Sequence, residues 1–127
     1  MSARILVIED NPTNMELTGY LLNAAGYTFL AATDGAQGLE MIRRERPDLI
    51  LCDLQMPVLD GYEVLRQLRI DAPLASIPIV AVTALSMPGD QRKVLQAGFD
   101  GYISKPIDPE TFVTQLETWL APDKRTR

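Results

Sequence analysis

Five short apolar runs, each followed by a segment with helical spacing of its apolar residues, constrain the fold of this chain most. The runs cover residues 5–8, 28–32, 49–52, 79–82 and 102–103. The helical segments are expected at about residues 14–25, 35–42, 60–68, 88–97 and 108–120. An alternation of strand and helix of this kind is typical of an α/β sheet with parallel strands.

The first, third and fourth runs are apolar at every position instead of alternating with polar residues. Parallel strands that helices cover on both faces have this pattern. We therefore predict an α/β fold, a doubly wound five-stranded parallel sheet with five helices. The 127 residues fit one domain. We assign residues 1–122 to that domain and residues 123–127 to a short, polar, solvated tail.

The overall charge and hydropathy exclude several classes of partner and location. The net charge is −5 and the pI is about 4.6, which disfavours direct binding of nucleic acid. No apolar run approaches the roughly 18 residues of a membrane-spanning helix. The N-terminal residues lack the anatomy of a signal peptide. We therefore expect a cytoplasmic protein without a membrane partner.

The counts of histidine and cysteine exclude several kinds of catalytic and metal site. The chain has no histidine and one cysteine, Cys52, which lies inside an apolar run. Ser-His-Asp catalysis, histidine-ligated zinc and a cysteine-cluster metal site are therefore ruled out. The chain also cannot supply its own phosphohistidine.

Polar side chains gather where the predicted strands end. Glu9 and Asp10 follow the first strand, Asp53 the third, Thr83 the fourth and Lys105 the fifth. Ligands of an open parallel sheet bind beyond the carboxyl ends of its strands. Carboxylates about 5 Å apart at an effective dielectric near 20 repel by roughly 3 kcal/mol per pair. A hard divalent cation with oxygen ligands, Mg²⁺ or Mn²⁺, would offset this repulsion.

Any single carboxylate of this kind is more often a helix cap or a solvated loop residue. We interpret Asp34, Asp60 and Asp108 in this way, with Asp60 and Glu63 forming a capping box. Asp108 with Pro109 is expected to start the last helix. Capping explains the five strand-end residues poorly as a set. Two of them share the loop after the first strand, and the other three follow the ends of three different strands.

Four segments of the sequence match the pattern of one protein family. The chain resembles the receiver domains of two-component response regulators over about residues 4–120. The matching segments are VIEDN at residues 7–11, DLQMPVLDG at 53–61, VTA at 82–84 and SKP at 104–106. The resemblance implies a flavodoxin-like receiver fold with strand order 2-1-3-4-5. The segments around the first and fourth strands look most like relay-type and cell-cycle-type single-domain receivers.

The resemblance implies that Asp53 takes a phosphoryl group from a phosphohistidine on another protein. An aspartate carboxylate is ordinarily ionised at neutral pH, so such a nucleophile needs no general base. By the same resemblance, Mg²⁺ would bridge Asp10, Asp53 and the backbone carbonyl of Gln55. Glu9 would reach the metal through water.

The resemblance also gives roles to the residues after the fourth and fifth strands. Lys105 would pair with a phosphoryl oxygen, and a cis Pro106 would aim it inward, although an X-Pro bond is more often trans. Thr83 would donate its hydroxyl to the phosphoryl group, and the small Ala84 would leave access to Asp53. Tyr102 matches the aromatic switch position, with a half-buried strand tyrosine as the alternative.

Partners are expected to carry the output, because no DNA-binding or catalytic output module is present. The donor would be a sensor histidine kinase or a histidine phosphotransfer protein. The face made by the fourth helix, fifth strand and fifth helix would bind a downstream protein, since the fourth helix is the least hydrophobic. The protein would be a relay shuttle or a protein-binding switch rather than an enzyme acting on other molecules.

Four alternatives remain at the level of sequence. A flavodoxin-like cofactor protein would need a phosphate-binding first loop, whereas residues 9–12 begin with two acidic residues, Glu9 and Asp10, and would repel phosphate. A small-molecule phosphatase would carry a second aspartate at position 55, which is Gln55. The chain could be a fragment of a hybrid kinase, although Met1 and the short tail favour a natural single-domain protein. It could also be a receiver-fold docking module that acts without phosphorylation.

Overall fold

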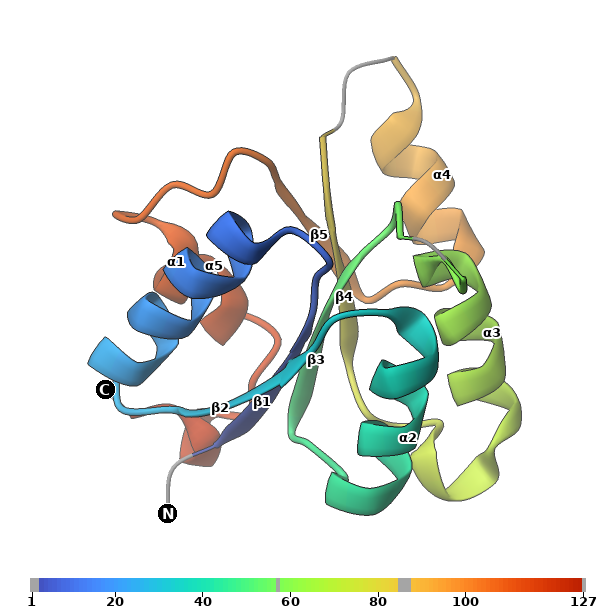
Figure 1. The fold of residues 1–127 in the computed structure, drawn as a ribbon, viewed down its shortest axis with the longest axis horizontal. Coiled ribbons are helices and arrows are strands. Elements are labelled where there is room, and N and C mark those ends of the chain that lie inside the picture. The colour runs from blue at the N-terminus through green and yellow to red at the C-terminus, as the bar shows by residue number, and fades with distance from the viewer. Residues whose placement is uncertain (1–2, 57, 85–87, 127) are drawn as a thin grey trace.

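The computed structural model describes residues 3–56, 58–84 and 88–126. Five parallel strands form one sheet in the order β2-β1-β3-β4-β5, which confirms the predicted topology (Figure 1). Every neighbouring pair of strands is parallel. The strands are β1 (Arg4–Ile8), β2 (Thr28–Ala32), β3 (Leu49–Asp53), β4 (Ile79–Thr83) and β5 (Gly101–Ser104).

Helices cover both faces of the sheet. The α-helices are α1 (Pro12–Ala24), α2 (Gly35–Glu45), α3 (Gly61–Ile70), α4 (Asp90–Ala97) and α5 (Phe112–Glu117). Two short 3₁₀ helices cover Ala72–Leu74 and Pro122–Lys124. Figure 1 shows α1 and α5 on one side of the sheet and α2, α3 and α4 on the other. No helix in the described ranges is long and apolar enough to span a membrane.

The uninterrupted apolar strands make two hydrophobic cores, one on each face. Leu6 and Ile8 of β1 belong to the core beneath α2, α3 and α4. Ile5 and Val7 of the same strand belong to the core beneath α1 and α5. Alternate residues of a strand point to opposite faces, so burial of both faces requires apolar residues throughout.

Three polar residues begin helices as capping residues. The side chain of Asn11 accepts a hydrogen bond from the backbone N–H of Asn14 at 3.0 Å. Asp34 accepts from Gln37 at 2.8 Å, and Asp60 accepts from Glu63 at 3.0 Å. These bonds satisfy backbone donors at the helix starts. The interpretation of Asp34 and Asp60 as caps is confirmed.

The prediction that the last helix starts at Asp108 and Pro109 is wrong. The residues after Asp108 form a turn, in which its side chain accepts from the N–H of Glu110 at 3.0 Å. The helix α5 begins at Phe112, after Thr111. Aspartate and proline favour turns as strongly as helix starts, so the sequence pattern does not separate the two.

The C-terminal segment contacts the body of the domain. The Nζ of Lys124 lies 3.2 Å from a carboxylate oxygen of Asp48. The Thr126 hydroxyl donates to the carbonyl of Ala25 at 2.6 Å, and the Thr126 N–H donates to the Tyr27 hydroxyl at 3.3 Å. Residues 124–126 are therefore exposed but connected to the end of α1 and to the loop before β3.

Candidate functional site

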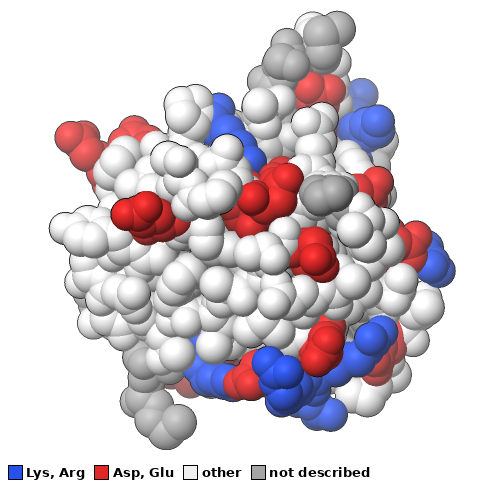
Figure 2. Space-filling view, viewed as in Figure 1, with Lys and Arg blue, Asp and Glu red and all other residues white. Residues whose placement is uncertain are grey.

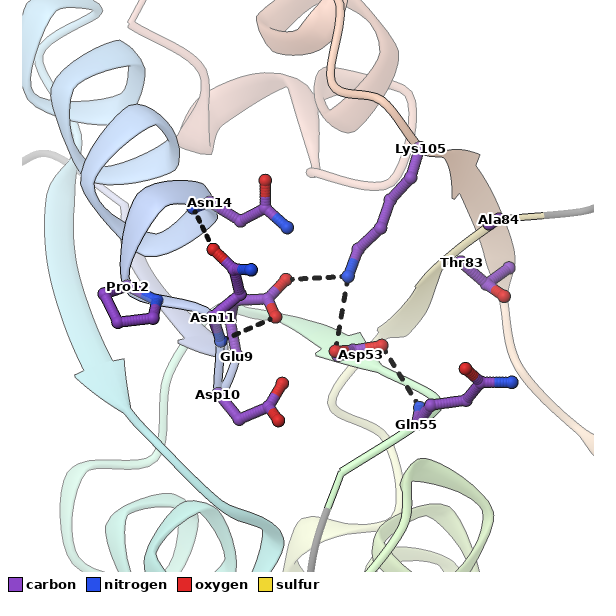
Figure 3. A pocket seen from close by; sticks show the side chains of 10 residues that line it. All are labelled: Glu9, Asp10, Asn11, Pro12, Asn14, Asp53, Gln55, Thr83, Ala84 and Lys105. Carbon is purple, nitrogen blue, oxygen red and sulfur yellow. Dashed lines mark hydrogen bonds and ion pairs between the residues drawn. The ribbon is translucent and has the colours of Figure 1, made fainter.

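A pocket of about 470 Å³ opens at the carboxyl ends of the strands (Figure 3). The loops after β1, β3, β4 and β5 and the first turn of α1 form its walls. It brings together every strand-end residue selected from the sequence. The lining residues are Glu9, Asp10, Asn11, Pro12, Asn14, Asp53, Gln55, Thr83, Ala84 and Lys105.

Asp53 lies on the floor of this pocket as the last residue of β3. It is 6% exposed. Its Oδ1 accepts a hydrogen bond from the backbone N–H of Gln55 at 3.1 Å. Cys52 before it is fully buried, and burial raises the pKa of its thiol. The thiol is therefore held in its neutral form, and the carboxylate of Asp53 is the better nucleophile of the two.

Lys105 crosses the pocket and pairs with two carboxylates. Its Nζ lies 3.0 Å from Oε1 of Glu9 and 3.3 Å from Oδ2 of Asp53. Burial lowers the pKa of Lys105, but its contacts with Glu9 and Asp53 outweigh this effect and raise the pKa. The ammonium is therefore retained. The peptide bond between Lys105 and Pro106 is cis, as the family resemblance implied.

Glu9 is buried at the start of the loop after β1. It is 4% exposed, and its Oε2 accepts from the N–H of Asn11 at 3.2 Å. Burial raises the pKa of Glu9, and the adjacent Asp53 raises it further. The hydrogen bonds from Asn11 and Lys105 oppose this rise. Two buried carboxylates thus share one lysine, so the pocket floor has more negative than positive charge.

Three carboxylates offer oxygen atoms that could hold a metal ion. Oxygen atoms of Glu9, Asp10 and Asp53 all lie within 4.8 Å of one another. Asp10 is exposed, whereas the other two are buried. An all-oxygen set of hard ligands suits Mg²⁺ or Mn²⁺. The donor set and the excess negative charge therefore fit a divalent cation.

The charged side chains are unevenly distributed over the molecule. Figure 2 shows a group of acidic side chains near the upper centre of the viewed face, with cationic side chains beside it, and a band along the lower edge in which cationic and acidic side chains are mixed. The upper end holds the carboxyl ends of the strands (Figure 1). An anionic substrate approaching this end meets like charge, which a bound cation would reduce.

Thr83 and Tyr102 lie on neighbouring strands but in different surroundings. Thr83 ends β4 and lines the main pocket and a second cavity of about 300 Å³. Tyr102 of β5 is half-buried and pairs in register with Ala81 of β4. It packs against the core beneath α2, α3 and α4. Neither cavity has Tyr102 among its described lining residues. Its role as a switch stays a prediction.

Three lining residues, Asn11, Pro12 and Asn14, were given no role in the site from the sequence. Asn14 lies in the first turn of α1, three residues after the cap Asn11, and its side chain points into the pocket (Figure 3). Residues three apart share one face of a helix. Because the helix starts immediately after Asp10, the face that carries Asn11 and Asn14 lies towards the pocket. The spacing of these two residues was therefore the signal in the sequence that could have identified Asn14.

Comparison with known proteins identifies the family. The family described as response regulator receiver domain matches residues 5–117. The chain belongs to this family. It is a receiver domain of two-component signalling, and proteins of this family are signalling proteins rather than classical enzymes. The resemblance derived from the four sequence segments is confirmed.

Similar relatives and solved structures agree with this assignment. The polar-differentiation response regulator DivK of Brucella anthropi is 40% identical over 120 residues, which cover 94% of this chain and 98% of the relative. A receiver domain of a Pseudomonas aeruginosa sensor histidine kinase was solved with a magnesium ion coordinated in its active site cleft. It is 36% identical with a TM-score of 0.84, covering 94% of this chain and 98% of that one.

A second similar structure contains a partner protein. The receiver domain of the Saccharomyces cerevisiae response regulator Ssk1 was co-crystallised with the histidine phosphotransfer signaling protein Ypd1. It has a TM-score of 0.86 and is 27% identical to this chain, covering 98% of this chain and 96% of that one. Similarity therefore extends to receivers of separate regulators and to receivers within kinases.

Proposed function

We propose that Asp53 accepts a phosphoryl group from a phosphohistidine on another protein, in a reaction that requires Mg²⁺ or Mn²⁺. The observation that carries this proposal is the contact of Lys105 with Asp53 at 3.3 Å on a floor of three clustered carboxylates. Phosphoryl transfer requires mainly positioning and neutralisation of charge. The pocket supplies a carboxylate nucleophile together with one ammonium group, that of Lys105.

Each wall of the pocket has a role in this reaction. Asp53 is the nucleophile, and the N–H of Gln55 holds one of its oxygens at 3.1 Å. The Lys105 ammonium, a compact charge, pairs with an oxygen of the transferred group. Thr83 donates its hydroxyl to another oxygen, and the small Ala84 beside it leaves the approach open.

Asp10, Asp53 and the backbone carbonyl of Gln55 would hold the cation, with Glu9 acting through a water molecule. The cation would neutralise negative charge on the reacting groups. The clustering of the three carboxylate side chains within 4.8 Å supports this set. The magnesium in the similar Pseudomonas receiver supports the choice of metal.

The donor would be a sensor histidine kinase or a histidine phosphotransfer protein, as the Ypd1–Ssk1 complex suggests by analogy. The output would pass through α4, β5 and α5 to a downstream protein. The exposed α4, in which Val94 is the buried residue, supports a face that rearranges. Tyr102 would turn inward as Thr83 moves. We further propose a cytoplasmic location and a receiver domain at residues 1–122, followed by a short polar tail.

The alternative is a receiver-fold docking module that acts without phosphorylation. The two proposals differ in whether Asp53 becomes modified. The test is intact-mass spectrometry after incubation with Mg²⁺ and a small phosphodonor such as acetyl phosphate. We expect one phosphoryl group, stable in acid and labile in base, as for an acyl phosphate. The Asp53→Asn variant should remain unmodified.

The control for this experiment is a known receiver treated in parallel. Unmodified wild-type protein beside a labelled control would contradict the proposal and favour the docking module. Labelling of Asp53→Asn equal to that of the wild type would place the modification on another residue. Omission of Mg²⁺ should abolish labelling, and its restoration by Mn²⁺ would support an oxygen-ligated divalent cation.

A further inference from the structure

The carboxamide of Asn14 is a polar group in the pocket without a role in the fold. The Asn14 N–H donates to Oδ1 of Asn11 at 3.0 Å, and its carbonyl accepts from the Thr18 hydroxyl at 2.7 Å. These bonds fix the backbone of the first turn of α1. The side chain, in contrast, makes no hydrogen bond or ion pair with any other described residue.

The side chain of Asn14 is directed into the pocket although it has no hydrogen-bonding partner among the described residues. Asn14 is half-buried and projects from the helix into the pocket on the side towards Lys105 (Figure 3). A carboxamide both donates and accepts hydrogen bonds. We expect a half-buried carboxamide on a helix to form a stabilising hydrogen bond when a ligand supplies a partner.

The charged side chains of the pocket already interact with one another. Glu9 and Asp53 bind Lys105, and Asp10 completes the acidic cluster. Asn14 adds a neutral carboxamide, with a donor and an acceptor, on the α1 side of the pocket (Figure 3). In an in-line displacement, the attacking and leaving atoms lie on opposite sides of phosphorus. Since Asp53 attacks from the floor, the leaving group departs towards the mouth of the pocket.

We infer that Asn14 is a specificity-determining residue that selects phosphodonors with a nitrogen leaving group. The inference rests on the proposed function. The bond formed joins an Asp53 oxygen to phosphorus, and the bond broken is the P–N bond, whose electron pair stays on nitrogen. If the donor is already protonated, its leaving group departs as neutral imidazole or ammonia and needs no further proton. Oδ1 of Asn14 accepts an N–H of the leaving group and thereby favours the protonated donor.

Acyl phosphates differ in the group that leaves. Acetate departs as an anion that has oxygen acceptors and no N–H, so it cannot use the Oδ1 acceptor of Asn14 and can only accept from the Nδ2 group. The ratio of the rate constants for phosphoramidate and acetyl phosphate therefore reports on Asn14. Effects on Mg²⁺ binding, on Asp53 or on folding act on both donors and cancel in this ratio.

The experiment measures the labelling of Asp53 by each donor at the same Mg²⁺ concentration. Asn14→Leu keeps the size of the side chain and removes its hydrogen bonding. We expect the phosphoramidate to acetyl phosphate ratio to fall about five-fold, the effect of one hydrogen bond. Asn14→Asp keeps the acceptor and removes the N–H donors that acetate could use, so it should raise the ratio. Asn23→Leu, at the exposed far end of α1, is the matched control and should leave the ratio unchanged.

The outcomes separate this inference from the proposed function. An unchanged ratio in Asn14→Leu, or equal falls in Asn14→Leu and Asn14→Asp, overturns the role of Asn14 while Asp53 is still labelled. Failure of the wild type with both donors overturns the proposed function and the inference with it. As a second readout, titrated imidazole should shift the side-chain amide resonances of Asn14 and not those of Asn23. Absence of this shift also counts against the inference.

Discussion

The charges around Lys105 show how function shapes individual residues. Burial disfavours the charged forms of Glu9 and Lys105 alike, yet the structure places both beside Asp53. The raised pKa of Lys105 keeps its ammonium charged, and the raised pKa of Glu9 reflects incomplete compensation by this single cation. If these residues served only to stabilise the fold, we would expect an apolar residue in place of one of the two buried carboxylates.

Val58 adopts a backbone conformation that its side chain disfavours. Its φ is +71°, and its side chain is 84% exposed. A branched residue in the left-handed region costs about 1–2 kcal/mol, whereas asparagine tolerates it. We predict that Val58→Asn raises the free energy of unfolding by about 1 kcal/mol, since almost no packing is lost. Urea denaturation of the two proteins checks this value.

The control for Val58→Asn is Val58→Ile, which keeps the branch at Cβ and should leave the free energy of unfolding unchanged. Equal stabilisation by both variants would show that strain at this position is not the cause. The labelling rate of Asp53 should be measured in parallel, because residue 58 lies in the loop that follows β3. A change in that rate would mean that the strained loop also positions the nucleophile.

At the level of elements, the start of α3 is packed directly against the end of β3. A Cβ atom on Gly61 would lie 2.7 Å from the carbonyl oxygen of Asp53 and 3.0 Å from the Cα of Leu54. The N–H of Gly61 also donates to the carbonyl of Leu54 at 3.1 Å. Backbone atoms cannot move aside as a flexible side chain can. The glycine of the DLQMPVLDG segment thus permits α3 to support the nucleophile.

We predict that Gly61→Ala lowers the free energy of unfolding by about 1–3 kcal/mol and slows labelling of Asp53. Alanine has the higher helix propensity by about 1 kcal/mol, so propensity alone would give the opposite sign. Chemical denaturation and mass spectrometry measure the two effects. Gly26→Ala, with φ +89° at the far end of α1, is the control. It should be destabilised by backbone strain but labelled at the normal rate.

The sheet could be predicted from sequence more reliably than the helix ends. The strands β1, β3 and β4 are buried on both faces, and each therefore appears in the sequence as a short, continuous apolar run. Runs of this length and pattern are typical of buried parallel strands. The start of α5 could not be predicted, because Asp108 serves a turn as readily as a helix. Phe112, the first residue of α5, is nevertheless fully buried, as an apolar residue within the predicted helix range would be.

The candidate site shows the same division between pattern and geometry. The strand ends predicted that Asp53 and Lys105 would meet, because the carboxyl ends of parallel strands share one edge. The simultaneous contact of Lys105 with Glu9 could not be predicted, because it depends on side-chain conformation. The left-handed conformation of Val58 could not be predicted either, since the residue type argues against it.

At the scale of the whole molecule, a buried polar pair links distant parts of the chain. Tyr27, before β2, donates its hydroxyl to a carboxylate oxygen of Glu117 in α5. The same hydroxyl accepts from the N–H of Thr126. The pair lies on the α1 and α5 side, where Tyr27 belongs to the core. One hydroxyl thus joins α5, the start of β2 and the C-terminal segment.

This link predicts a specific dependence of stability on pH. Burial raises the pKa of Tyr27, and Glu117 raises it further, above the ordinary value near 10. A raised pKa in the folded state gives stability that is present below pH 10 and lost as the pH rises further. Tyr27→Phe should therefore lower the free energy of unfolding by about 1–3 kcal/mol at pH 7. Above pH 10 the difference in this free energy between the variant and the wild type should become smaller. Urea denaturation at pH 7 and 10.5 tests this, with Tyr20→Phe, at a 70% exposed residue, as the neutral control. A difference that stays constant between the two pH values would show that the hydroxyl acts through packing and not as a hydrogen-bond donor.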